Sequence, residues 1–174
     1  MTDRHPELSE YDPRYSRYME RVPESGLIAV MLNQIEETAS FMTSIPKEKY
    51  DYRYAPDKWT LREVFGHISD VERAFGYRAL CGARGDQVEL KRIDGDLYIK
   101  NGDFGRLSMA ELSIEFELAR KSNAKFLQHL PDVAWDRPAM ISSATVTVRA
   151  LGYLMVGHER HHLKIIKELY LKVV

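Results

Sequence analysis

Apolar residues recur every three or four positions along several stretches of the chain. In residues 24–44 the repeat runs through Leu27, Val30, Met31, Ile35, Ala39 and Met42. Because an α-helix has about 3.6 residues per turn, this spacing puts the apolar side chains on one helical face. The same reasoning predicts helices over residues 61–82, 109–129 and 147–171. Four helices of about 20 residues without a convincing sheet predict an all-α four-helix bundle.

Capping residues mark where these helices begin. Thr60 with Glu63, and Ser108 with Glu111, have the spacing of a capping box, in which each side chain binds the other residue's backbone amide. Thr147 has the position of an N-cap for the last helix. Pro46 closes the first helix, and Gly82 and Gly85 are expected to end the second.

Three segments lie outside the predicted helices. Residues 1–23 form an arm that contains three prolines, and its tyrosines (Tyr11, Tyr15 and Tyr18) indicate that it packs onto the rest of the chain. Residues 85–107 form a long loop rich in Gly and Asp between the second and third helices. Residues 142–148, SSATVTV, have the β-branched composition of an extended strand but no obvious partner strand. Residues 24–174 are expected to form a single bundle domain.

Composition excludes several classes of partner. The chain carries 25 basic and 26 acidic residues in a length of 174, so it has no basic excess for nucleic acid or an anionic membrane. No apolar run approaches the roughly 20 residues of a membrane span, and no signal peptide is visible. The single cysteine, Cys81, rules out an internal disulfide and fits a reducing compartment. A cytoplasmic location is therefore expected.

The strongest chemical signal is the segment LMVGHERHHLKII, residues 154–166. It holds His158, His161 and His162, three of the six histidines. Residues four apart lie on one helical face, so His158 and His162 can bind one metal ion together. His67 lies beside the apolar stripe of the second helix and can join them if the two helices are neighbours. Three nitrogens with an open position are typical of a catalytic zinc site.

Other interpretations of these histidines were weighed. A single histidine on an apolar face is usually a hydrogen-bonded core residue, which applies to His67 taken alone. The segment also contains His-Glu-x-x-His, but a zinc protease needs a third ligand on a later segment, and the only carboxylate after His162, Glu168, is on the same helix. A di-iron bundle needs two Glu-x-x-His motifs, whereas Glu63 and His67 have the wrong spacing.

The chain resembles the DinB/YfiT-like family of metalloproteins. The resemblance is carried by YMERVP (18–23), DYRYAPDKWTLREVFGHISDVERAFGYRAL (51–80), ARGD (83–86) and VTVRALGYLMVGHERHHLKIIKELYL (146–171). It implies a four-helix bundle, commonly a homodimer, that binds a divalent metal such as zinc or nickel. The family's ligands match His67, His158 and His162, and they leave His161 out. The loop over residues 88–105 departs from the family pattern, and it is expected near the open side of the metal.

The resemblance also implies a class of reaction. Characterised relatives include transferases that join a low-molecular-weight thiol to a small electrophile, and a metal ion stabilises the thiolate that such a reaction needs. A metal-dependent hydrolase and a non-catalytic metal- or ligand-binding stress protein stay as alternatives. Asp70 and Glu159 are candidates to orient a ligand or accept a proton, and Arg78 is a candidate to bind a substrate or thiol carboxylate.

Overall fold

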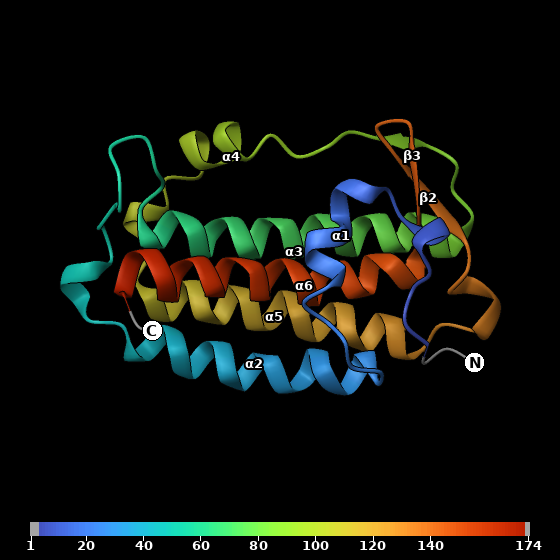
Figure 1. Ribbon diagram of the computed structural model, residues 1–174, viewed down its shortest axis with the longest axis horizontal. Coiled ribbons are helices and arrows are strands. Elements are labelled where there is room, and N and C mark those ends of the chain that lie inside the picture. Colours follow the sequence, from blue (N-terminus) through green and yellow to red (C-terminus); the bar gives the residue numbers. More distant parts are fainter. Residues whose placement is uncertain (1–3, 173–174) are drawn as a thin grey trace.

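Four long helices run side by side along the molecule and form its body (Figure 1). The computed structural model describes residues 4–172. The helices are α2 (Leu27–Ser44), α3 (Leu61–Arg84), α5 (Met109–Gln128) and α6 (Val148–Ile165), and α6 continues as a π-helical segment, Ile166–Leu171. Helix α3 packs against α5 and α6, and α2 packs against α5 and α6. The predicted all-α four-helix bundle is confirmed.

The predicted capping residues begin three of the four helices. The Thr60 hydroxyl accepts a hydrogen bond from the Glu63 amide at 3.2 Å, and the Glu63 carboxylate accepts one from the Thr60 amide at 2.6 Å. Ser108 and Glu111 form the same reciprocal pair at the start of α5. The Thr147 hydroxyl accepts a hydrogen bond from the amide of Ala150 at the start of α6. These side chains satisfy amides that have no partner within the first helical turn.

Two helix boundaries differ from the prediction because of glycines with left-handed backbone geometry. Helix α2 begins at Leu27 rather than at residue 24, since Gly26 precedes it with φ +79°. Helix α3 runs two residues beyond residue 82 and ends at Arg84, where Gly85 has φ +75°. A left-handed residue ends helical geometry, and glycine adopts it without steric cost.

The structure contains a small sheet, so the extended segment expected within residues 142–148 has a partner strand that was not obvious from the sequence. Strand β2 (Pro138–Ile141) pairs antiparallel with β3 (Ala144–Thr147), and β1 (Glu89–Leu90) pairs parallel with β2. Ser142 and Ser143 form the two-residue turn with φ +46° and +64°. Such turns usually carry Asn or Gly, so a Ser-Ser turn gives little signal in the sequence.

The arm and the long loop are more ordered than the sequence indicated. The arm contains a helical turn, α1 (Ser16–Met19), which packs against α6, and its tyrosines contact the core as expected. The long loop contains β1 and a short helix, α4 (Gly95–Gly102), whose N-cap is the side chain of Asp94. No helix among residues 4–172 is long and apolar enough to cross a membrane.

A buried polar cluster interrupts the apolar core. Arg120 of α5 is fully buried, and its guanidinium lies 2.9 Å from the carboxylates of both Glu72 (α3) and Glu159 (α6). It also donates to Gln34 of α2 at 3.4 Å and to the carbonyl of Met155 at 3.1 Å. One side chain therefore contacts the other three long helices, and it neutralises charges that would be costly to bury alone.

Replacing Arg120 by Ala is expected to lower the free energy of unfolding by about 3–5 kcal/mol, because Glu72 and Glu159 lose their buried partner. Urea unfolding followed by circular dichroism measures the change. The control is Lys121→Ala, whose side chain is exposed at the next position of α5 and whose loss is expected to cost less than about 0.5 kcal/mol. Equal effects of the two substitutions would contradict the role given to Arg120.

Candidate metal centre

Three histidines from two packed helices converge at one point in the structure. His67 lies on α3, and His158 and His162 lie one turn apart on α6. The Nε2 atom of His158 is 3.2 Å from Nε2 of His67 and 3.1 Å from Nε2 of His162. One ring nitrogen from each residue lies within 4.8 Å of the others. The sequence predicted that His67 could join the other two histidines only if α3 and α6 are neighbours. The two helices do pack against each other.

The spacing of these nitrogens fits a shared metal ion. Two nitrogens bound to a tetrahedral zinc ion at about 2.0–2.1 Å lie about 3.3 Å from each other. The observed separations of 3.1 and 3.2 Å are close to that value. The three facing atoms are all Nε2, and for each of them the described residues offer only the other imidazoles of the cluster as partners. Three ring nitrogens that face one another in this way are the arrangement of a metal-ligand set.

Burial keeps the three imidazoles neutral. It lowers the pKa of His67 from 6.5 to about 4, and the nearby carboxylate of Asp96 opposes this only in part. Burial also lowers the pKa values of His158 and His162 well below their ordinary value, and the neighbouring histidines lower them further. A neutral imidazole has the free lone pair that a metal ion binds. The site is thus ready to bind a cation at neutral pH.

The segment that follows β1 covers the His67 side of the cluster. The ring of Trp59 lies 4.7 Å from the ring of His67, measured between centroids, and its Nε1 donates to the carboxylate of Asp96 at 3.0 Å. At Gly95, the first residue of α4, a Cβ atom would lie 3.0 Å from Trp59 and 3.6 Å from His67. The long loop was expected near the open side of the metal, and the structure places the start of its helix α4 against His67.

The arm covers the α6 side of the cluster. The ring of Tyr18 makes edge-on contacts with His158 and His161 at centroid separations of 5.4 and 5.2 Å. The backbone of Tyr18 lies so close to Gly157 that a Cβ there would be 2.2 Å from the Tyr18 carbonyl oxygen. His161 thus lies against the arm, and it is not part of the three-histidine group. The docking of the arm depends on a glycine next to the first α6 histidine.

The other candidate residues from the sequence lie away from the three histidines. The carboxylate of Glu159 is fully buried beside Arg120 and accepts a hydrogen bond from Thr38, and burial raises its pKa to about 7. The side chain of Asp70 lies 3.5 Å from Arg73, which pairs with Glu115 of α5. Glu159 therefore serves the core, and Asp70 faces the α3–α5 surface.

Arg78 is buried and supports the long loop. Its guanidinium donates to the carbonyl of Lys91 at 2.7 Å, and burial lowers its pKa. It lies 5.6 Å from the centre of the Phe75 ring, and that ring is 6.1 Å from the ring of His158. Arg78 is therefore separated from the cluster by Phe75.

Two residues beside the cluster were not identified from the sequence. Tyr18 and Asp96 come from the arm and the long loop, and neither segment has a periodicity that reports where it docks. Trp59, which precedes α3 and carries no signal of a site in the sequence, packs against His67 of the cluster. The Asp-rich character of the loop was the only available signal for Asp96.

Comparison with known proteins places the chain in a family. A family model described as the DinB superfamily matches residues 32–166, which include all three histidines. The chain belongs to the DinB superfamily. A comparison with curated protein sequences finds no match.

The DinB-superfamily fold is also seen in a solved structure. YfiT from Bacillus subtilis, described as a probable metal-dependent hydrolase with an unusual four-helix bundle topology, superposes with a TM-score of 0.75. The match covers 98% of this chain and 93% of that chain at 16% sequence identity. At this identity the likeness shows a shared fold.

The depressed pKa of His67 predicts how stability of the metal-free protein depends on pH. Between about pH 4 and 6.5 the unfolded chain binds a proton at His67 that the folded protein does not, so stability falls as pH falls. The expected loss from pH 7 to pH 5 is on the order of 2 kcal/mol for this residue.

Urea unfolding at the two pH values, compared with His67→Gln, measures this effect. The comparison is needed because other groups also contribute: the lowered pKa values of His158 and His162 give slopes of the same sign, and the raised pKa of Glu159 gives one of opposite sign. The difference between pH 7 and pH 5 is expected to shrink in the variant. An unchanged difference would show that His67 is protonated in the folded protein.

Proposed function

We propose that this DinB-superfamily protein binds one divalent transition metal ion, zinc or nickel, through His67, His158 and His162, and that it is a metal-dependent enzyme. The observation that carries the proposal is the convergence of three ring nitrogens within 4.8 Å. Their low pKa values keep these nitrogens available as ligands at neutral pH. All three come from long helices, which hold a site more precisely than loops do.

The residues around the histidines have distinct tasks in this proposal. A bound ion would lower the pKa of a thiol or a water molecule at its open position. The rings of Trp59 and Tyr18 pack against His67 and His158 and so narrow the access to the cluster from two sides. Asp96 lies near enough to His67 to influence its pKa, and Trp59 holds its carboxylate in place. We assign Asp96 as the proton acceptor on that side.

The proposed reaction is transfer of a low-molecular-weight thiol to a small electrophile. A second candidate is hydrolysis of a small substrate. The carboxylate of Asp96, which Trp59 holds in place, favours hydrolysis. It can act as the general base that removes a proton from an attacking water molecule, and a thiol needs such a base less because it ionises more readily. The description of YfiT as a probable metal-dependent hydrolase supports the same candidate.

Metal content is the first test. Protein purified without a tag or added metal is expected to hold about one equivalent of a transition metal by elemental analysis, and His158→Ala/His162→Ala is expected to hold none. The control is His129→Ala, which removes an exposed histidine outside the cluster. If the native protein takes up neither zinc nor nickel, or if the control loses metal as well, the metal-site proposal is wrong.

The two candidate reactions make different demands on Asp96. If the protein is a hydrolase, Asp96→Asn is expected to lower kcat/KM for ester or amide cleavage at least tenfold, with metal content unchanged. If it is a transferase, product forms only with added thiol and consumes one thiol per electrophile. The control is Asp103→Asn, an exposed carboxylate of the same loop. Metal-loaded protein that catalyses neither reaction would favour the non-catalytic alternative.

A further inference from the structure

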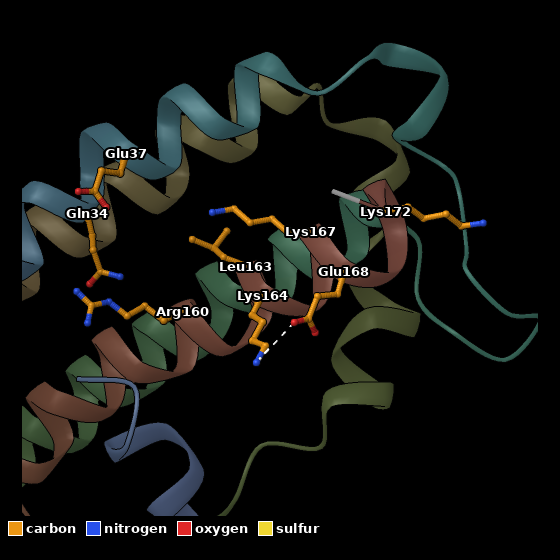
Figure 2. A pocket seen from close by; sticks show the side chains of 8 residues that line it. All are labelled: Gln34, Glu37, Arg160, Leu163, Lys164, Lys167, Glu168 and Lys172. Carbon is orange, nitrogen blue, oxygen red and sulfur yellow. Dashed lines mark ion pairs between the residues drawn. The ribbon is translucent and has the colours of Figure 1, made fainter. Parts of the chain in front are cut away.

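A groove between α2 and α6 is lined by four basic and two acidic side chains among its eight residues (Figure 2). Its lining residues are Gln34, Glu37, Arg160, Leu163, Lys164, Lys167, Glu168 and Lys172, and its volume is about 580 Å³. This volume is within the range of about 300–1,000 Å³ that is typical of small-molecule pockets. The groove is therefore large enough to hold a ligand.

The groove is separate from the histidine cluster. Arg160 and Lys164 each follow a cluster histidine by two residues, which is about 200° around a helix. The groove and the three histidines therefore lie on opposite sides of α6. A ligand in the groove would not contact the histidines.

Positive charge exceeds negative charge along the groove. Arg160 is paired with Glu24 at 2.8 Å, and Lys164 lies 3.5 Å from Glu168. Neither Lys167 nor Lys172 has a carboxylate within ion-pair distance among residues 4–172; the ammonium of Lys167 lies 5.2 Å from the centre of the Phe41 ring. The excess cations favour an anionic ligand.

A buried amide faces the same space. The side chain of Gln34 is 3% exposed, and Figure 2 shows its amide pointing from α2 into the groove. Its Oε1 accepts a hydrogen bond from Arg120, while its Nε2 has no partner among the described residues. This nitrogen is not enclosed by protein atoms, so it can donate a hydrogen bond to a group in the groove. Leu163 adds apolar surface to the groove.

We propose that this groove binds a small organic anion, with a carboxylate or phosphate group on a short aliphatic stem. Lys167, which points into the groove in Figure 2 and has no carboxylate partner among residues 4–172, attracts the anionic group. Lys164, about one helical turn before it on α6, adds positive charge at the edge of the groove beside its partner Glu168. The Gln34 amide donates a hydrogen bond to it, and the stem packs against Leu163. The site is distinct from the proposed metal centre and does not depend on it.

Isothermal titration calorimetry at low salt tests the proposal with four probes: hexanoate, hexyl phosphate, 1-hexanol and inorganic phosphate. At least one of the two amphiphilic anions is expected to bind saturably with one site per chain, and the stronger of the two identifies the anionic group. Hexanol and inorganic phosphate are each expected to bind at least tenfold more weakly. Equal binding of hexanol, or no saturable binding by either anion, would overturn the proposal.

Two variants locate the binding site. Lys164→Gln/Lys167→Gln is expected to weaken binding at least tenfold, whereas Lys121→Gln/Lys125→Gln, the matched change on α5, is expected to leave it unchanged. An equal loss of binding in both variants would show that the anion responds to the overall charge of the protein and not to this groove, which would contradict the proposal.

The His158→Ala/His162→Ala variant separates the groove from the metal centre, since anions also bind metal ions. This variant is expected to bind the anion normally. Loss of binding here, with normal binding in Lys164→Gln/Lys167→Gln, would place the anion at the histidines and contradict the proposal.

Discussion

The guanidinium of Arg120 is the contact on which the arrangement of the four long helices depends. It reaches Glu72 on α3, Glu159 on α6 and Gln34 on α2 from the centre of α5. Burying three charged groups is tolerable only when each has its partners in good geometry, so few alternative packings can satisfy this cluster. Apolar contacts tolerate small rotations of a helix, but this network does not.

The network has a direct consequence for the histidines. His158 precedes Glu159 in the chain, so the rotation of α6 that turns Glu159 toward Arg120 also turns His158 and His162 toward α3. On α3, Glu72 lies little more than one turn beyond His67. The ion pairs and the three-histidine cluster thus lie in neighbouring layers of one bundle, and the ion pairs help to hold the histidines in place.

Helix α6 presents a different group of side chains on each of three sides. His158 and His162 face α3, Glu159 faces the core, and Arg160, Lys164 and Lys167 face the groove beside α2. The helix supplies the rigid part of each site. The residues that cover the histidines, Tyr18 and Asp96, come instead from the arm and the long loop. Access to the three histidines is therefore set by segments outside the four long helices.

The sequence by itself determined the four long helices, three of their capping residues and the histidines that meet. Periodicity and capping act over a few residues, and His-x-x-x-His places two ligands on one face wherever the helix packs. Tertiary structure decided the partner of strand β3, the burial of Glu159 against Arg120 and the positions of Tyr18 and Asp96. Each of these depends on contacts between segments far apart in the chain, which local patterns do not encode.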